Sequence, residues 1–297
     1  KLKLTTNKNN IDKIIFFIMQ FTSTSLYIVS TPIGNLDDIT LRAIDVLKNS
    51  DFILCEDTRH SLKLLNHLKI KKKLISYHKF NEKKNISSVL SHINRGKILS
   101  LISDAGTPLL SDPGKVLLNA CVENKIKIIP IPGVSSITSA LSASGFDDKF
   151  IFYGFLPKTI NELDKVFSAL SKQTYTQIFF IPAIKINFYL KKIKDYYAGR
   201  KLLIAKEMTK IHEAFFREDI DKLNVHNYNL KGELTLVISE SSIKKININE
   251  KNVIFLAKKY LKKYSLKDTV DLIFAKEKLN KKAIYKLCLS LKNEKIF

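Results

Sequence analysis

Residues 98–114 read ILSLISDAGTPLLSDPG, and this stretch decides how the fold is interpreted. The first part, 98–102, is mostly apolar and too short for a helix, which indicates a buried strand. The small residues and the carboxylate of 103–108 then leave room for a ligand against bare backbone, as expected at the carboxyl end of a parallel strand. The simpler interpretation is a strand-to-helix turn. We favour it only for Asp112 as helix N-cap and Pro113 at the first helical position.

Similar short apolar segments recur on both sides of this strand. Those at 26–30, 51–55, 74–76 and 127–131 alternate with helical patterns, which predicts a parallel sheet with right-handed crossovers. Beyond residue 145, strand patterns outnumber helices and predict a mixed sheet with a hairpin near its end. The expected fold class is therefore α/β, with two domains and a small helical C-terminal extension. The expected parts are an accessory N-terminal segment at 1–24, an N-terminal α/β domain at 25–131, a C-terminal mixed α/β domain at 132–242 and a lysine-rich helical extension at 243–297.

The chain is strongly basic, with a formal net charge of +22 over 297 residues. Such a charge suggests an anionic partner, either nucleic acid or an acidic membrane face. However, only five of the 50 basic residues are arginine, and lysine, isoleucine, asparagine and phenylalanine all abound. This composition is typical of AT-rich codon usage, which adds lysines without selecting a binding face, so the charge alone does not identify an anionic partner. Residues 241–297 carry 15 lysines against five acids, which fits either a solvated surface or an RNA contact.

Several classes of protein and of site are not supported. The three cysteines are far apart and odd in number, which fits a reducing compartment, here taken as the cytoplasm. No apolar run reaches the roughly 18–20 residues of a membrane span. The apolar segment 13–21 lacks a cleavage pattern, and we expect residues 1–18 to be accessory. The six histidines show no metal-type spacing, so no metal is expected. Neither GxGxxG nor GxxxxGK[ST] occurs.

Polar or small residues follow four of the expected strands, at 31–35, 56–60, 103–108 and 132–136. The carboxyl ends of parallel strands meet at one edge of a sheet, so these segments should lie close together. The segment 56–60, Glu-Asp-Thr-Arg-His, is dense in groups that could position a substrate hydroxyl and accept its proton. Its alternative role is structural, with Asp57 capping the next helix. His78 and the polar segment 206–213 are weaker candidates.

These segments, taken together and in this order, resemble the bacterial 16S ribosomal RNA cytidine ribose 2′-O-methyltransferases of the tetrapyrrole methylase superfamily. The resemblance covers about residues 25–240. It implies S-adenosylmethionine (SAM) in a cleft between two α/β domains, 16S ribosomal RNA in the 30S subunit as substrate, and a homodimer. The residues that would line the cofactor are Pro32, Asp104, Ala105, Gly106, Thr107, Ser135 and Ser136, with Gly34 and Asn35 at its edge. The catalytic candidates that would face the RNA are Glu56, Asp57, Arg59 and His60, with Asp57 or His60 as proton acceptor.

One segment departs from this family. Residues 179–185 read FFIPAIK, where the family usually has Phe-Tyr-Glu-Ser-Pro-(His/Arg)-Arg, so we assign no catalytic role there. This departure keeps open a non-catalytic, RNA-binding ribosome assembly factor. A tetrapyrrole methyltransferase acting on a small molecule is the other alternative. The segment 31–35, Thr-Pro-Ile-Gly-Asn, argues against it, because those enzymes generally carry a Gly-x-Gly-Pro-Gly type of loop.

Overall fold

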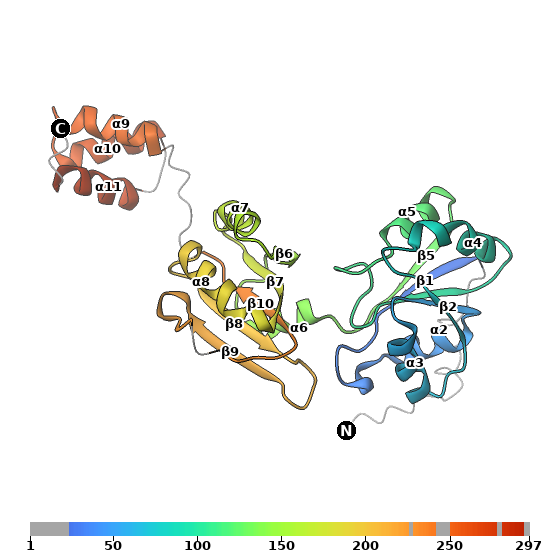
Figure 1. Cartoon of the computed structure of the whole chain (residues 1–297). Coiled ribbons are helices and arrows are strands. Elements are labelled where there is room, and N and C mark those ends of the chain that lie inside the picture. The colour runs from blue at the N-terminus through green and yellow to red at the C-terminus, as the bar shows by residue number, and fades with distance from the viewer. Residues whose placement is uncertain (1–23, 226–227, 242–249, 278–280, 294–297) are drawn as a thin grey trace, which may run out of the picture.

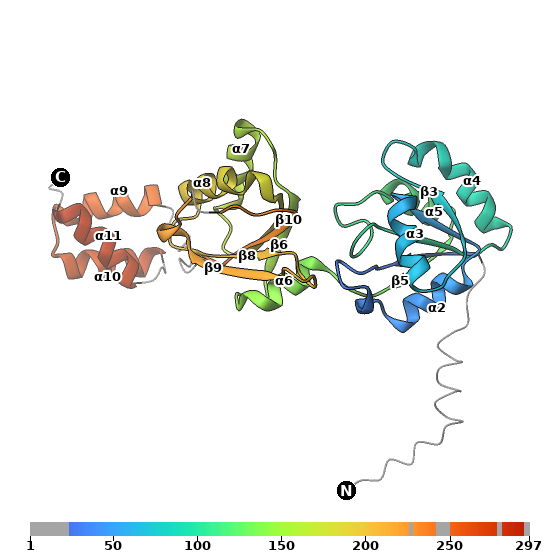
Figure 2. The ribbon, with the colours of Figure 1, turned by 60° about the horizontal axis from the view of Figure 1, so that its bottom comes forward.

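A computed structural model describes residues 24–225, 228–241, 250–277 and 281–293. Figure 1 shows two α/β halves and a helical bundle in a row, and Figure 2 shows the same order from another side. The predicted accessory segment lies outside the described residues, apart from Thr24. No helix in the described ranges is long and apolar enough to span a bilayer.

The first half contains a parallel sheet of five strands in the order β3-β2-β4-β1-β5. The strands are β1 (Ser25–Val29), β2 (Phe52–Cys55), β3 (Lys73–Ser76), β4 (Leu99–Ile102) and β5 (Lys127–Ile131). Every residue of β4 is buried, because this strand is the middle one and is covered on both faces. The sequence-based prediction of a central strand within 98–102 is therefore confirmed.

The helices divide between the two faces of this sheet. On one face, α2 (Leu41–Asn49) and α3 (Thr58–His67) share a core with β1 and β2. On the other face, α4 (Glu82–Asn94) and α5 (Lys115–Glu123) share a core with β4. The helix after β4, α5, thus lies on one face of the sheet. The helices after the two neighbouring strands, α2 after β1 and α3 after β2, lie on the opposite face. Such a reversal opens a crevice at the carboxyl ends of the strands.

Two predictions about the start of α5 are wrong. Asp112 is not the N-cap and Pro113 is not in the helix, because α5 begins at Lys115 after Gly114, which has φ 119°. Gly114 packs so closely that a Cβ there would lie 2.8 Å from Leu101 Cδ2. The backbone therefore turns at the glycine, in a left-handed conformation that side chains disfavour. Asp112 is left in the preceding loop, half-buried.

The second half contains a mixed sheet in the order β6-β7-β10-β8-β9. Its strands are β6 (Phe150–Phe155), β7 (Thr176–Pro182), β8 (Lys201–Lys206), β9 (Ala214–Asp219) and β10 (Glu233–Ile238). β6 and β7 are parallel, whereas the other pairs are antiparallel, and β8 and β9 form the expected hairpin. One face packs against α7 (Ile160–Leu170) and α8 (Ile186–Tyr196). The other packs against α6 (Ser136–Ser144), through Ile137 and Ala140.

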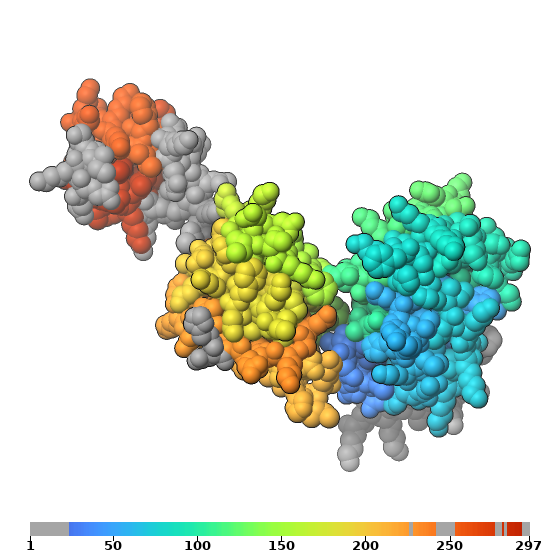
Figure 3. All heavy atoms as spheres, viewed as in Figure 1, coloured from blue at the N-terminus to red at the C-terminus, as the bar shows by residue number. Residues whose placement is uncertain are grey.

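The bundle consists of α9 (Glu250–Leu261), α10 (Leu266–Glu277) and α11 (Lys281–Asn293). It has a hydrophobic core of its own, to which Val253, Ile273 and Ile284 contribute one residue from each helix. The helical apolar spacing of the lysine-rich region is thereby explained, since the apolar positions face one another. Figure 3 shows the bundle as a separate mass beside the second half.

Candidate functional site

The strand order brings the four polar segments to one edge of the first sheet. β2, β4, β1 and β5 are adjacent, and they end at 56–60, 103–108, 31–35 and 132–136 respectively. This proximity, which the sequence analysis predicts, follows from the parallel arrangement.

Hydrogen bonds hold the loop after β4 in place. Thr31 and Gly106 exchange two backbone hydrogen bonds, with N–H to O distances of 2.9 and 3.0 Å. The Ser103 hydroxyl donates to the carbonyls of Ala105 and Gly106 at 3.3 and 3.2 Å. Gly106 has φ 79°, a conformation that side chains rarely adopt. These hydrogen bonds hold the loop backbone in one conformation. The positive φ at Gly106 favours a residue without a side chain at that position.

Thr107 connects this loop to the segment after β5. Its hydroxyl donates to the carbonyl of Val134 at 3.3 Å and lies 3.1 Å from the Ser30 hydroxyl. Ser135 follows directly and is the N-cap residue of α6, the helix that packs against the second sheet. The two halves of the chain are thus joined at the rim of the loop after β4.

A cavity of about 580 Å³ lies between the two halves. The first half contributes 104–107 and 110–112, and the second half contributes residues of β7, β8 and β10. Figure 3 shows the hollow between the two masses. Its volume falls within the range of about 300–1,000 Å³ that is usual for cofactor sites.

The residues around this cavity fit SAM, which carries a sulfonium and an ammonium cation. Ala105 and Gly106 leave the backbone open to a ligand, and a Cβ at Gly106 would already lie 3.4 Å from Ile33 Cγ2. Carboxylates of Glu56, Asp104 and Glu233 line the same space, and they suit a cationic ligand. Burial, followed by the Asp104 charge, raises the pKa of Glu56.

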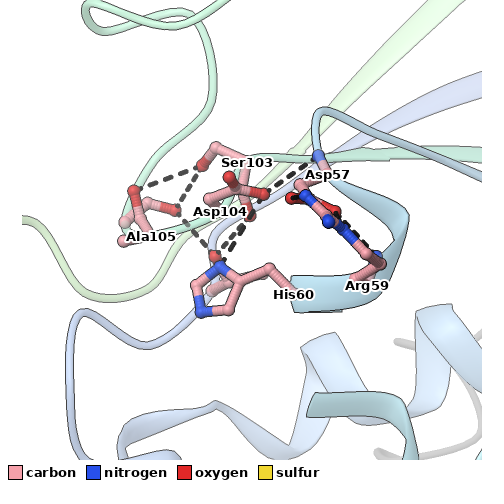
Figure 4. Close-up of polar contacts among 8 residues, drawn as sticks. Asp57, Arg59, His60, Ser103, Asp104 and Ala105 are labelled. Atoms are coloured by element: carbon pink, nitrogen blue, oxygen red, sulfur yellow. Dashed lines mark hydrogen bonds and ion pairs between the residues drawn. The ribbon is translucent and has the colours of Figure 1, made fainter. Parts of the chain in front are cut away.

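The segment 56–60 contacts the loop after β4 through Asp104 (Figure 4). The Asp57 N–H donates to Asp104 Oδ1 at 3.2 Å, and His60 Nδ1 lies 3.8 Å from the same oxygen. Asp57 itself is the N-cap of α3 and accepts from the Arg59 N–H at 2.8 Å. The structural interpretation of Asp57 is therefore confirmed.

The Asp57 carboxylate is also paired with the Arg59 guanidinium, at 2.8 Å between Nη2 and Oδ2. These hydrogen bonds hold the pKa of Asp57 well below its usual range. A carboxylate so stabilised in its ionised form is a weak proton acceptor. Asp57 and Arg59 do not line the large cavity.

A second cavity, of about 370 Å³, lies on the other side of Asp104. The predicted site residues Pro32, Gly34 and His60 line this second space, together with Lys63 and Lys210. The predicted residues that line the large cavity are Glu56, Asp104, Ala105, Gly106, Thr107, Ser135 and Ser136. Asn35 lies further out, in a shallow groove beside the β8–β9 loop. The structure thus divides most of the predicted set between two cavities that share Asp104 and Ala105, whereas Asn35, Asp57 and Arg59 line neither.

Sequence reasoning missed Asp112, which lines the large cavity. Burial and the Glu56 carboxylate raise its pKa to about 6. The available signal was its position in the segment that follows the same strand as Asp104, eight residues further along the chain. In the sequence analysis Asp112 is assigned to a helix N-cap, because Asp followed by Pro is typical of a helix start.

The departing segment 179–185 supplies core residues and one wall residue. Phe179 and Ile181 are fully buried in the core under α7 and α8, whereas Phe180 lines the large cavity. Within the described part of the chain, no group of three or more His, Cys, Asp or Glu side chains could hold a metal ion.

The model of the family Tetrapyrrole (Corrin/Porphyrin) Methylases matches residues 25–224 of this chain. The chain belongs to the tetrapyrrole methylase family. Membership confirms the predicted fold and SAM as the cofactor of this methyltransferase. Solved structures agree on the fold. A uroporphyrin-III C-methyltransferase from Thermus thermophilus has a TM-score of 0.53 at 18% identity, covering 73% of this chain and 94% of that one. The methyltransferase CobJ has a TM-score of 0.57 at 14% identity, with the same coverage.

Two curated relatives of this tetrapyrrole methylase carry the name ribosomal RNA small subunit methyltransferase I. The protein from Rickettsia prowazekii is 44% identical over 88% of this chain and 94% of its own length. The protein from Mesomycoplasma conjunctivae is also 44% identical, over 75% of this chain and 94% of its own length. About a quarter of this chain therefore has no aligned counterpart in the second relative.

Proposed function

We propose that this tetrapyrrole methylase transfers a methyl group from SAM to the 2′-hydroxyl of a cytidine ribose in 16S ribosomal RNA. The observation that carries the proposal is the 44% identity, over 88% of the chain, to a relative named as a small-subunit ribosomal RNA methyltransferase. The 2′-oxygen and the cytidine come from the motif resemblance at 31–35, 56–60, 103–108 and 132–136. A 2′-hydroxyl target also makes RNA, and not DNA, the substrate.

In this mechanism, alignment is the main contribution of the protein. SAM supplies a methyl carbon that its sulfonium already activates. The chain must therefore hold one oxygen in line with that carbon, which can contribute about 7–11 kcal/mol. A positioned base adds about 10²–10⁴-fold. Rigid backbone at Ala105 and Gly106 would hold the cofactor, and Ser135 and Ser136 would close the cavity from the second half.

Basic side chains beside the second cavity support the approach of an RNA strand. Lys63 and Lys210 line this space, and Arg59 has a side chain that is 88% exposed nearby on α3. Cations at such positions neutralise phosphates and orient the strand without reading its sequence. In this arrangement the RNA strand lies along the second cavity, beside His60, and the target ribose reaches past Asp104 into the large cavity, where the methyl donor would bind.

The test is incubation of 30S subunits, free 16S ribosomal RNA and uroporphyrinogen with labelled SAM and the full chain. The expected result is label in one cytidine of the RNA, located by mass spectrometry of nuclease fragments and resistant to alkali at that position. Label on a nucleobase would contradict the ribose target, and label on the tetrapyrrole would identify the alternative small-molecule activity. Tight RNA binding without transfer would identify a non-catalytic assembly factor.

The homodimer also belongs to this proposal, because only the resemblance implies it. Sedimentation of the full chain at micromolar concentration measures it directly. We expect the mass of two chains, since the family resemblance extends through both α/β halves. A single-chain mass at all concentrations would contradict this part alone.

A further inference from the structure

The loop between β4 and α5 is strained, and it reaches into the large cavity. Leu109 and Ser111 have φ 75° and 73°, values that residues other than glycine rarely adopt, and Gly114 has φ 119°. Between these positions, residues 110–112 line the cavity. Strained backbone of this kind persists only where the surroundings hold it, and it gathers at functional sites.

Both halves of the molecule hold this loop. On the first half, the Gly114 N–H donates to Glu82 Oε2 of α4 at 3.1 Å. On the second half, β6 has a glycine, Gly154, where a Cβ would lie 3.0 Å from Ser111 Oγ. The loop is thus hydrogen-bonded to the first half and closely packed against the second. The position of Asp112 is therefore set by the fold.

Charged groups surround Asp112 on several elements. Glu56 follows β2, Asp104 follows β4, Glu233 begins β10, and all three carboxylates interact with it. Glu207 and Lys210, from the loop after β8, line the same cavity. Burial and the neighbouring carboxylates raise the pKa of Asp112 to about 6, against a hydrogen bond from Ser103. Such a group is ionised at neutral pH and still a better proton acceptor than an ordinary aspartate.

The two acceptors predicted from the sequence are less suited. Asp57 is committed to Arg59 and to the N-terminus of α3, and it lies outside the large cavity. His60 lines the second cavity and not the large one, in which SAM is proposed to bind. Asp112 shares its cavity with Ala105, Gly106 and Ser135.

We propose that Asp112 accepts the proton of the substrate hydroxyl during methyl transfer. The inference rests on the proposed function. As the ribose oxygen bonds to the methyl carbon, the carbon–sulfur bond breaks and its electron pair stays on sulfur. The hydroxyl proton passes to the Asp112 carboxylate and then to solvent through the open cleft. The net products are the methyl ether, neutral S-adenosylhomocysteine and one proton.

The experiment compares wild type, Asp112→Asn and Asp112→Glu, with Glu56→Gln as a second cleft variant and the exposed Asp195→Asn as control. It measures single-turnover methylation of 30S subunits at saturating SAM from pH 5 to 8, together with SAM affinity by calorimetry. We expect Asp112→Asn to slow transfer by about 10²–10⁴-fold. SAM affinity should stay within about threefold, and Asp112→Glu should recover part of the rate.

The pH profile supplies a readout that a structural role would not change. The active form of Asp112 is ionised, so the wild-type rate should fall tenfold per pH unit below about pH 6. Asp112→Asn should lose this acid limb, and Asp195→Asn should keep it unchanged. Glu56→Gln should keep the limb but move it to lower pH, because the Glu56 charge helps to raise the pKa of Asp112. A wild-type enzyme that transfers no methyl group refutes the proposed function itself.

Two outcomes overturn the assignment while the proposed function stands. One is an Asp112→Asn enzyme that keeps its rate within about threefold, or keeps the acid limb. The other is loss of SAM affinity at unchanged single-turnover rate, which would make Asp112 a cofactor ligand. If Asp112→Asn fails to fold by circular dichroism, Asp112→Glu decides. Its acid limb must then shift from that of wild type, and an unshifted limb refutes the proposal.

Discussion

Asp57 caps helix α3, although it is also proposed from the sequence as a proton acceptor. It accepts hydrogen bonds from the N–H of Arg59, at 2.8 Å, and from the Arg59 guanidinium, at 3.2 and 2.8 Å. The side chain thus satisfies an N–H at the start of α3 that would otherwise lack a partner. Nothing in this geometry requires the carboxylate to accept a proton.

We predict that Asp57→Asn keeps both fold and methyl transfer, since asparagine caps a helix as well as aspartate does. Asp57→Ala should lower the free energy of unfolding by about 1 kcal/mol, because the cap is lost. Urea unfolding and single-turnover methylation measure the two effects. A drop of about 100-fold or more in the Asp57→Asn rate, with unchanged stability, would restore Asp57 as the acceptor.

Gly106 is the position of the cofactor site at which we expect a larger side chain to be most harmful. A leucine there would have to adopt φ 79° and would extend from the loop that the cofactor must approach. We predict that Gly106→Leu weakens SAM binding at least 100-fold by calorimetry, about 2.7 kcal/mol. Asp104→Ala should abolish SAM binding, because Asp104 lines both cavities.

A matched control separates this effect from backbone strain. Gly199 has φ 75°, and a Cβ there would meet nothing within 4 Å. Gly199→Leu should therefore suffer a similar strain, about 1–2 kcal/mol, and still bind SAM. Equal loss of SAM binding in the two variants would show that Gly106 acts through stability alone.

Asp112 has a predictable effect on stability as well as on the reaction. Its pKa rises from the ordinary 3.8 to about 6 on folding, so the folded state binds this proton more tightly than the unfolded chain does. Its contribution therefore makes the protein less stable as the pH rises from about 4 to about 6. We predict that Asp112→Asn raises the Tm relative to wild type above pH 6, and that the difference vanishes below pH 4. A lower Tm for Asp112→Asn at pH 7 would indicate that the carboxylate supports the fold.

Periodicity predicts helices and strands well here, but it does not predict where a loop goes. The buried strand β4 and the amphipathic α2 follow from local pattern, and the hydroxyl of Thr40 caps α2. The loop at 109–114 does not, because the pattern Ser-Asp-Pro-Gly fits a helix start equally well. Contacts with α4 and β6, distant in sequence, decide its course. Asp112 could therefore be found only in the folded molecule.

The β8–β9 loop, residues 207–213, packs against the connection after β1 and closes one side of the site. The Asn35 N–H donates to Thr209 Oγ1 at 3.0 Å. A Cβ at Gly34 would lie 2.5 Å from Lys210 Cγ and 2.7 Å from Thr209 Oγ1. The close approach of these two elements, one from each half, thus requires a glycine.

We predict that Gly34→Val displaces this loop and weakens SAM binding about tenfold, or 1.4 kcal/mol, because Lys210 and Glu207 leave the cavity wall. Calorimetry measures the affinity. Ile211→Ala is the control, since Ile211 belongs to the same loop but is 98% exposed. Unchanged SAM affinity in Gly34→Val would mean that the cleft does not depend on this contact.

The molecule as a whole separates a cofactor cleft from a basic bundle. Residues 241–297 carry 15 of the lysines and five acids, so they hold about ten of the 22 net positive charges. The residues that line the two cavities described above precede this region, and the bundle has its own core. The sequence composition reveals the positive charge of the bundle. Whether this charge can contact RNA depends on which lysines face outward. Three lysines that face outward are Lys259 on α9, Lys263 on the turn that follows, and Lys267 on α10.

We predict that a chain ending at residue 241 binds SAM as wild type does but binds 16S ribosomal RNA more weakly, with a shallower dependence of log K on log salt concentration. Each lost phosphate contact reduces the slope by about 0.7–0.9. The full-length triple variant Lys259→Gln, Lys263→Gln, Lys267→Gln should therefore reduce it by about two to three while leaving the bundle in place. Filter binding at 50–300 mM salt measures both chains. If the slope is unchanged in both, the lysines are a solvated surface, and RNA binding depends on the cleft and on Lys63 and Lys210 alone.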